Sequence, residues 1–382
     1  MVTRKQKMKY EYYIYFTNII FKMINETKSF LPPLNEYVKY LEGIWDRGHL
    51  TNHGPLVHEL EERIKAYLGV KHFFFVNNGT IALQIAIKAA NLNDDVITTP
   101  FSYVATTSSL VWEGCRPVFA DVLKGRLTLD PKSVEENLTP KTSGILATHV
   151  YGNPCDVEEI ENIARTKGIK VIYDAAHAFG VEYKGRSILN YGDISTISFH
   201  ATKIFHTIEG GGLVTEDDDL AHRISYMRNF GHNGPDKFFG VGVNGKSSEF
   251  QAAMGLCLLP KMHEIIRIRK SICHRYNENL EALPLKFLEM QEGTTRYNFA
   301  YFPIIFRTEN ELLKVLKELI NRDIHPRRYF YPSLNTLNFV DNNLRESISE
   351  YMASRVLCLP LYPELSLETV DLISNIIREN LN

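Results

Sequence analysis

Three groups of residues in this sequence are of the types that could act together on one ligand. Lys203 follows an apolar run and precedes a run of glycines. A lysine amine attacks an aldehyde when its pKa is lowered or when the imine that forms is stabilised. Asp174 ends another apolar run, where a buried carboxylate requires a cation or hydrogen-bond donors. Gly79 and Thr80 begin an expected helix, whose first N–H groups favour a phosphate.

Each group also has an ordinary structural interpretation when it is taken alone. Gly79 and Thr80 fit a turn with a helix cap, and Asp174 fits a cap or a surface ion pair. Lys203 alone fits a solvated surface lysine. Together, however, they are the three anchors that pyridoxal phosphate requires. These are an amine for its aldehyde, an acid that keeps its ring nitrogen protonated, and a phosphate cradle. The combination therefore predicts a pyridoxal phosphate site.

The elements that must position these residues follow from the alternation of two patterns. Helical stretches with a period of about 3.6 residues lie between most of six apolar, strand-like runs, at 72–76, 95–98, 117–120, 144–149, 170–174 and 195–199. Such alternation predicts an α/β fold with a mainly parallel sheet covered by helices on both faces. Sheets of this kind bind ligands at the carboxyl ends of their strands. The glycine run after Lys203 is expected to be a mobile turn at the edge of this sheet.

The last third of the chain predicts a smaller domain. A long helical pattern over 248–283, interrupted by a proline, is expected to connect it to the sheet. Thr308 and Ser366 are candidate caps for helices over 309–320 and 367–377. The chain is therefore divided into three parts: a poorly specified N-terminal extension over 1–29, a large α/β domain over 30–260, and a connecting helix with a small α+β domain over 261–382.

Composition excludes several classes of function. The 382 residues include 43 Lys and Arg against 45 Asp and Glu, a net charge of -2, so no nucleic-acid partner is expected. The five cysteines form no CxxC pair, which argues against a disulfide framework and against a zinc or other metal site, and fits a reducing cytoplasm. The apolar run within the first 29 residues is shorter than the about 18 residues that a membrane span needs.

The order of short motifs along the chain resembles the DegT/DnrJ-type nucleotide-sugar aminotransferases. These depend on pyridoxal phosphate and have the aspartate-aminotransferase-like fold, called fold type I, with a large domain and a small α+β C-terminal domain. The resemblance covers nearly the whole chain from about residue 30. It rests on the segments 51–55, 100–106, 151–154, 174–178, 198–203, 209–211, 244–246, 251–256 and 357–360.

The resemblance implies a role for each matching residue. Lys203 holds the cofactor covalently as an imine, and Asp174 pairs with the ring nitrogen. His177 lies beside the phenolic oxygen of the ring. Tyr103 stacks on the ring, although alone it would fit a core aromatic residue. The phosphate is held by four residues, the last of which reaches it from the partner of a homodimer: Gly79, Thr80, Ser198 and Asn244.

The substrate is also implied by resemblance. Residues 244–256 are similar to a subgroup that makes dTDP-4-amino-4,6-dideoxy-D-glucose from dTDP-4-keto-6-deoxy-D-glucose and L-glutamate, for surface polysaccharide such as O-antigen. Asn78 and Lys246 depart from the serine and arginine that are common in the family. The candidate substrate contacts, for each of which a surface or capping role is an alternative, are Thr51, Asn52, His206, Lys246, Arg327 and Tyr331.

Three other functions are compatible with parts of this pattern. A 3-keto-sugar aminotransferase of the same family would share all the cofactor residues. A dehydratase of the same fold would carry histidine in place of the lysine, so Lys203 argues against it. A non-catalytic binder or regulator would have no need of Lys203, Asp174 and His177 together.

Overall fold

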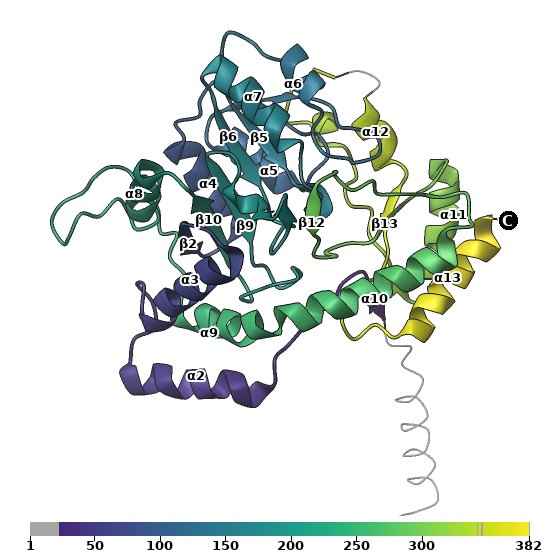
Figure 1. Cartoon of the computed structure of the whole chain (residues 1–382), viewed down its shortest axis with the longest axis horizontal. Helices are drawn as coiled ribbons and strands as arrows, with labels where there is room; N and C mark the ends of the chain where they lie inside the picture. The colour runs from purple at the N-terminus through teal and green to yellow at the C-terminus, as the bar shows by residue number, and fades with distance from the viewer. Residues whose placement is uncertain (1–22, 342, 345–346, 382) are drawn as a thin grey trace, which may run out of the picture.

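The computed structural model describes residues 23–341, 343–344 and 347–381. A seven-stranded sheet forms the centre of the larger domain (Figure 1). From β4 to β9 all neighbouring strands are parallel, which confirms the predicted mainly parallel sheet. The strands, in spatial order, are β2 (His72–Val76), β10 (Gly211–Thr215), β9 (Ile194–Ser198), β6 (Lys170–Asp174), β5 (Thr142–Thr148), β3 (Asp95–Thr98) and β4 (Arg116–Phe119).

The glycine run after Lys203 is a strand, so the prediction of a mobile turn was wrong. Gly211–Thr215 forms β10, which is fully buried and antiparallel to both β2 and β9. A Cβ atom at Gly211 would lie 2.6 Å from the carbonyl carbon of Asn78. Gly211 therefore serves close packing of backbone against backbone, and Gly212 leaves room for the ring of Phe73, with which an added Cβ atom would clash.

Helices cover both faces of the sheet. Alternate residues of β6 show this arrangement, because Val171 and Tyr173 belong to one hydrophobic cluster and Ile172 to another on the opposite face. The continuous apolar runs follow from this double burial. The helices of the domain are α2 (Leu34–Arg47), α3 (Pro55–Leu68), α4 (Gly79–Ala89), α5 (Val104–Trp112), α6 (Pro131–Glu136), α7 (Val157–Lys167), α8 (Asp218–Met227) and α9 (Glu249–Leu258).

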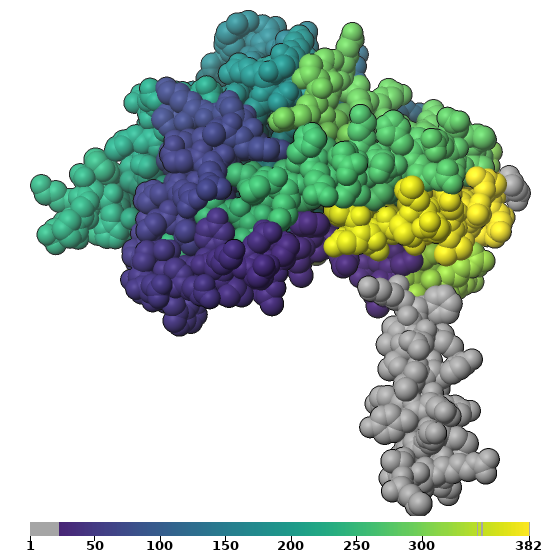
Figure 2. Space-filling model, turned by 60° about the horizontal axis from the view of Figure 1, so that its bottom comes forward, coloured from purple at the N-terminus to yellow at the C-terminus, as the bar shows by residue number. Residues whose placement is uncertain are grey.

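Two segments stand out from the body of this domain. Figures 1 and 2 show α2 lying along α9, and Figure 1 shows the segment between α8 and α9 projecting away from the sheet. Both segments expose large apolar side chains, among them Trp45 of α2 and Phe238 of the projecting segment. Trp45 also contacts Phe250 of α9 edge-on, with ring centroids 5.9 Å apart.

The smaller domain has its own core, built on a three-stranded antiparallel sheet of β11 (Lys286–Phe287), β13 (Pro303–Ile305) and β15 (Val356–Cys358). Thr308 and Ser366 cap helices as predicted, since their hydroxyls accept hydrogen bonds from the N–H groups of Glu311 and Thr369. The helices are α10 (Met262–Leu280), α11 (Glu309–Ile320), α12 (Ile348–Ala353) and α13 (Leu367–Leu381). Two further strand sets complete the fold. One joins β7 (Glu182–Tyr183), β8 (Arg186–Ser187) and β12 (Thr294–Arg296), and the other joins β1 (Ile24–Asn25) and β14 (Ile324–His325).

The connecting helix joins the two domains, as the sequence indicates. A short 3-10 helix that contains Pro260 separates α9 from α10. Ile265, early in α10, packs into the core of the large domain, whereas Ile272 packs into that of the small one. The change from one core to the other therefore takes place within α10. Among the described residues no helix is long and apolar enough to cross a membrane.

The predicted N-terminal extension over residues 1–29 reaches too far into the chain, because residues 24–29 contact the rest of the fold. β1 (Ile24–Asn25) pairs in parallel with β14 (Ile324–His325) of the small domain. Ser29 donates its hydroxyl hydrogen to the carbonyl oxygen of Ala201 at 2.7 Å. Residues 24–29 are therefore part of the fold, because their backbone finds partners that the sequence pattern does not reveal. Residues 1–22 lie outside the described residues.

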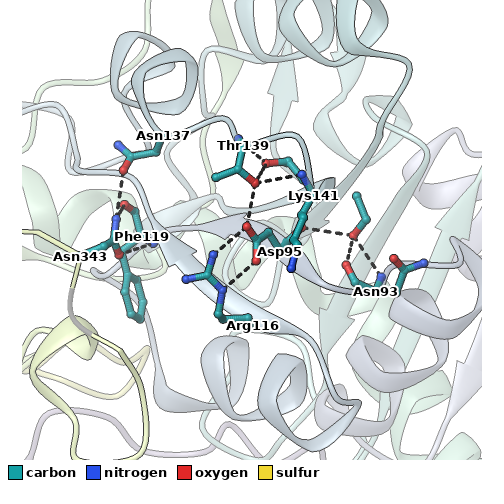
Figure 3. Close-up of polar contacts among 10 residues, drawn as sticks. Asn93, Asp95, Arg116, Phe119, Asn137, Thr139, Lys141 and Asn343 are labelled. Atoms are coloured by element: carbon teal, nitrogen blue, oxygen red, sulfur yellow. Dashed lines mark hydrogen bonds and ion pairs between the residues drawn. The ribbon is translucent and has the colours of Figure 1, made fainter.

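A side chain of the small domain extends the edge of the large sheet. Figure 3 shows Asn343 beside Phe119 of β4, the last strand of the sheet. The amide of Asn343 accepts from the N–H of Phe119 at 2.9 Å and donates to its carbonyl oxygen at 2.8 Å, as a further strand would. The same picture shows Asp95 of β3 held by Arg116 and Thr139. The contacts of Asn343 fix the edge strand against the small domain, whereas those of Asp95 fix it to β3 within the large one.

Candidate active site

A cavity of about 280 Å³ lies where the carboxyl ends of β6 and β9 face the small domain. The large domain contributes the ends of these strands, the first turn of α4 and the segment after β9. The small domain contributes the segment after β14. Residues of the predicted cofactor site that line it are Gly79, Thr80, Tyr103, Asp174, His177, Ser198 and Lys203, together with Arg327 from the predicted substrate contacts.

Lys203 lies in the segment after β9 and lines this cavity. Its Nζ atom donates to the hydroxyl oxygen of Tyr301 at 3.3 Å. Burial lowers the pKa of the Lys203 amine to about 8, while the carboxylates of Asp174 and Glu26 act in the opposite direction. A lysine with a lowered pKa is neutral in a larger fraction of molecules, and the neutral amine is the nucleophile and the base.

Asp174 ends β6 and is 5% exposed. Its two carboxylate oxygens accept hydrogen bonds from neutral donors, the hydroxyl of Thr106 at 2.7 Å and the N–H of Ala176 at 3.1 Å. Burial raises the pKa of Asp174, and these two hydrogen bonds oppose that rise. A buried carboxylate that meets neutral donors is suited to a cationic ligand group, such as a protonated ring nitrogen.

His177 presents an N–H group to the cavity. Its Nδ1 atom accepts a hydrogen bond from the backbone N–H of Tyr151 at 3.1 Å, so the hydrogen of the neutral ring is on Nε2. Burial lowers the pKa of His177 well below its usual value, and the positive charge of Lys203 adds to this effect. The ring stacks on Phe330 and meets Tyr301 edge-on, which fixes its orientation. His177 is therefore a neutral hydrogen-bond donor.

The first turn of α4 forms the end of the cavity that is suited to a phosphate. Asn78 caps the helix, since its Oδ1 atom accepts from the N–H of Ile81 at 2.8 Å. The N–H groups of Gly79 and Thr80 belong to the same turn, in which a helix leaves its donors unpaired. Gly79 lies against Ser198, because a Cβ atom at this glycine would be 3.0 Å from the Cβ atom of Ser198. Asn78, the departure from the family pattern, thus acts as the helix cap.

Tyr103 precedes α5 and is 57% exposed, with its side chain at the cavity. It is therefore not a core residue, which was the alternative interpretation. Arg327 also lines the cavity, beside the ring of Tyr329. Tyr331 is exposed outside this lining and lies under the guanidinium of Arg328, 3.6 Å from it.

Four predicted residues lie away from the cavity, near or around a second, open hollow. Asn52 and Lys246 line that hollow with Asn229, whose side-chain oxygen accepts a hydrogen bond from Lys246 at 2.9 Å. Thr51 and Asn244 are exposed neighbours of these residues in the chain. The structure therefore does not bring these four residues together with Lys203.

His206 is buried and uses both ring nitrogens inside the chain. Nε2 contacts the carbonyl oxygen of Phe30 at 2.8 Å, and Nδ1 accepts from the N–H of Ile208 at 3.3 Å. His206 therefore fastens the segment before α2 to the segment that follows Lys203, and it lies outside the cavity lining. The motif position that suggested substrate contact carries no information about this burial.

Sequence reasoning missed several residues of the site. Thr106 holds Asp174, Tyr301 contacts Lys203, and Phe330 stacks on His177. Thr106 carries no recognisable signal of its own in the sequence, although it belongs to the segment 100–106 that carries the family resemblance. Tyr301 and Phe330 come from the small domain, and only tertiary structure brings them to the sheet. Glu26 lies in the stretch that was interpreted as an extension.

The residues present fit pyridoxal phosphate. Lys203 supplies an amine with a lowered pKa, and Asp174 supplies a buried carboxylate with no cation among its hydrogen-bond donors in the described chain. The first turn of α4 and the hydroxyl of Ser198 supply phosphate donors at the same cavity. All three predicted anchors thus meet in one place.

Comparison with known proteins gives the same assignment. Residues 34–378 match the DegT/DnrJ/EryC1/StrS aminotransferase family. The dTDP-4-amino-4,6-dideoxy-D-glucose transaminase of Shigella dysenteriae is 42% identical over 371 residues, 94% of this chain and 99% of the relative. The enzyme of the same name from Escherichia coli is 38% identical over 93% of this chain and 98% of its own length.

Solved structures agree in fold. DesI, solved in the presence of its TDP-sugar product, superposes with a TM-score of 0.88 at 32% identity, covering 94% of this chain and 93% of that one. NtdA from Bacillus subtilis, solved with bound cofactor PMP, gives a TM-score of 0.83 at 26% identity, covering 91% and 82%. The chain belongs to the DegT/DnrJ/EryC1/StrS aminotransferase family and is a pyridoxal phosphate-dependent enzyme of fold type I.

Proposed function

We propose that this enzyme transfers the amino group of L-glutamate to C4 of dTDP-4-keto-6-deoxy-D-glucose. The products are 2-oxoglutarate and dTDP-4-amino-4,6-dideoxy-D-glucose. The observation that carries the proposal is the meeting of Lys203, Asp174 and His177 in one cavity. The choice of sugar is supported by the two relatives whose names give this product, at 42% and 38% identity over almost the whole chain.

Lys203 and Asp174 are the proposed catalytic residues. Pyridoxal phosphate, when bound, supplies an aldehyde that carries the amino group and a ring that withdraws electrons. With the cofactor bound, Lys203 would hold it covalently, and its Nζ atom, once displaced by glutamate, would accept the proton of the glutamate α-carbon. Asp174 would pair with the ring nitrogen and keep it protonated by its negative charge. Water would release 2-oxoglutarate, and in the reverse half, in which the keto-sugar gives that water back, Lys203 would deliver a proton to C4 of the sugar as C4 receives the amino group.

The other cavity residues are proposed to hold and orient. His177 donates its Nε2 hydrogen toward the phenolic oxygen of the ring, and Tyr103 stacks on the ring face. Ser198 and the first turn of α4, Gly79 and Thr80, hold the phosphate. Arg327 is proposed to hold an anionic substrate group at the cavity wall, with Tyr331 further out.

A homodimer completes the site in this proposal. Asn244, Lys246, Thr51 and Asn52 lie outside the cavity of their own subunit, which suits residues that serve the neighbouring one. Large apolar side chains are exposed on α2 and on the projecting segment, the kind of surface that subunit contacts cover. They are Leu34, Val38 and Trp45 on α2, and Phe230, Phe238, Phe239, Val241 and Val243 on the segment between α8 and α9.

The product class fits a supply of amino sugars for surface polysaccharide such as O-antigen, made in the cytoplasm. Some relatives are named for a GDP-linked sugar, such as the GDP-perosamine synthase of Vibrio cholerae at 29% identity. The nucleotide of the substrate therefore requires testing. The sugar carbon is a second variable, because a 3-keto-sugar aminotransferase would share all the cofactor residues.

The decisive experiment is a panel of dTDP- and GDP-linked 3-keto and 4-keto sugars with glutamate as donor. Mass spectrometry identifies the products, and NMR identifies the aminated carbon. Amination of the dTDP-linked 4-keto sugar at C4 is expected. Reaction of 3-keto sugars alone would contradict the assignment of C4. A yellow protein whose absorbance responds to no amino donor would contradict transamination and favour a binder.

A further inference from the structure

Glu26 lies deep in the protein at the junction of three separate segments. β1 ends one residue before Glu26 and runs parallel to β14. The carbonyl oxygen of Glu26 accepts a hydrogen bond from the N–H of Leu361 at 2.8 Å. Three residues later, Ser29 is bonded to Ala201, two residues before Lys203. Glu26 itself is 4% exposed. These contacts thus hold the segment of Glu26 beside the segment that carries Lys203.

The groups that surround Glu26 are mostly cations and phenols. Arg269 of α10, Lys203 after β9 and Arg327 after β14 each attract its carboxylate. The remaining titratable neighbours are the hydroxyls of Tyr301 and Tyr329 and the thiol of Cys358. Lys203 and Arg327 both line the cavity, so two of the three cations that face Glu26 belong to the active site.

The three cations differ in how free they are to respond. Arg269 is buried and donates to the carbonyl oxygens of Phe299 at 2.8 Å and Ala300 at 2.6 Å, so its position is fixed. Among the contacts of the described residues, the side chains of Lys203 and Arg327 make no such hydrogen bond to a backbone carbonyl oxygen. Burial raises the pKa of Glu26 to about 7 against the pull of all three, which makes its charge variable near neutrality.

We propose that Glu26 is a positioning residue of the active site, a second anion beside Asp174 that acts on the Lys203 amine and restrains Arg327 at the cavity wall. The inference rests on the proposed role of Lys203. Asp174 is engaged with the ring nitrogen when the cofactor is bound, so Glu26 is then the carboxylate that balances the positive charge at Lys203. Its charge favours the protonated lysine nitrogen, and its loss favours the neutral one.

A merely structural role is the competing explanation, since Glu26 also belongs to the segment that β1 fastens to the small domain. Three variants of the holoenzyme separate the two. Glu26→Gln keeps the shape and removes the charge, and Glu26→Asp keeps the charge on a shorter side chain. Glu364→Gln is the matched control, because it removes a partly exposed carboxylate that pairs with Lys28, close along the same segment.

The readout is the near-visible absorbance of the bound cofactor as a function of pH, which reports protonation of the Lys203 nitrogen. In Glu26→Gln the midpoint is expected to fall by on the order of one pH unit, because an anion that stabilises the protonated nitrogen is lost. Glu26→Asp restores part of the shift, and Glu364→Gln leaves the midpoint in place. A structural role would lower cofactor retention or thermal stability without moving the midpoint.

The outcome that overturns the inference is an unchanged midpoint in a folded Glu26→Gln holoenzyme. If that variant does not fold, the Glu26→Asp holoenzyme decides, because its shorter side chain moves the negative charge away from Lys203. A midpoint below that of the wild type supports the inference, and an unchanged midpoint in the folded variant overturns it. Borohydride reduction with peptide mapping tests the proposed function separately. No pyridoxyl label on Lys203 refutes that function, whereas a labelled Lys203 with an unmoved midpoint refutes only the role of Glu26.

Discussion

Thr106 donates its hydroxyl hydrogen to Asp174 at 2.7 Å, and both side chains are buried. Because that hydrogen is engaged, the contact of 2.8 Å between Thr106 and Ser102 must use the hydrogen of Ser102. The hydroxyl of Thr148 in turn donates to Ser102 at 3.1 Å. A chain of three hydroxyls therefore ends on the carboxylate, and each donor strengthens the next.

Thr106→Val should weaken catalysis without unfolding the enzyme. The hydrogen bond from Thr106 lowers the pKa of Asp174, so its loss lets burial raise that pKa further and weakens the negative charge that the ring nitrogen requires. A hydrogen bond to a charged group contributes about 1.5–3 kcal/mol, which corresponds to a loss of roughly 10- to 100-fold in kcat/KM. Steady-state kinetics with glutamate measures the loss.

Thr107→Val is the matched control for this prediction. Thr107 is the next residue of α5 and is equally buried, but its hydroxyl is without a partner among the described residues. Its replacement by valine should leave kcat/KM near the wild-type value. Equal losses in the two variants would show that the loss does not come from the hydrogen bond between Thr106 and Asp174.

Gly211→Ala should impair cofactor binding. An added Cβ atom would lie 2.6 Å from the carbonyl carbon of Asn78 and 2.8 Å from the backbone nitrogen of Gly79, so the first turn of α4 must shift. We expect the dissociation constant of pyridoxal phosphate to rise about tenfold or more, since 1.4 kcal/mol suffices for that factor. Fluorescence titration of the apoenzyme measures it.

Gly43→Ala in α2 provides the comparison, because the nearest atoms to its added Cβ atom belong to the flexible end of Arg47, at 3.0 Å or more. Cofactor affinity should be retained in this variant. If Gly211→Ala also retains it, the turn that holds Asn78 and Gly79 is more plastic than the close backbone packing indicates.

Much of the fold could be predicted because its signals are local. The strands over 72–76, 95–98 and 170–174 have the predicted bounds, and Thr308 caps the predicted helix. β10 could not be predicted, because glycine is depleted in strands and common in turns. Its two glycines, Gly211 and Gly212, are explained only by the backbone and side chains that they pack against.

The candidate site was predictable only where the chemistry resides in the residue type. Lys203, Asp174 and His177 have functional groups that the cofactor needs, and strand ends bring them together. Thr106 has a side chain with many other uses, and Glu26 lies in a stretch whose burial depends on pairing with residue 324, far along the chain. His206 shows the converse, since a histidine at a suggestive position is used in holding the backbone.

Lys203→Ala should abolish turnover, because no other amine takes over proton transfer at that position. Loss of a catalytic residue of this type is expected to cost at least about 10³-fold in kcat. The variant should still bind the cofactor without a covalent link, since Asp174, Ser198 and the first turn of α4 are unchanged. Absorbance spectra and mass spectrometry of the denatured variant check both points. Near-normal activity would contradict the role of the lysine.

The rate of the glutamate half-reaction should rise with pH and level off near pH 8. Burial lowers the pKa of Lys203 from 10.5 to about 8, so the amine freed by glutamate is protonated below this value and neutral above it. At pH 7 the neutral fraction is about 10%, against about 0.03% for an ordinary lysine. Below pH 8 the rate should therefore fall roughly tenfold per pH unit. Single-turnover absorbance measurements without the acceptor sugar isolate this step, and a rate that keeps rising to about pH 10 would show that the cavity leaves the amine with its ordinary pKa.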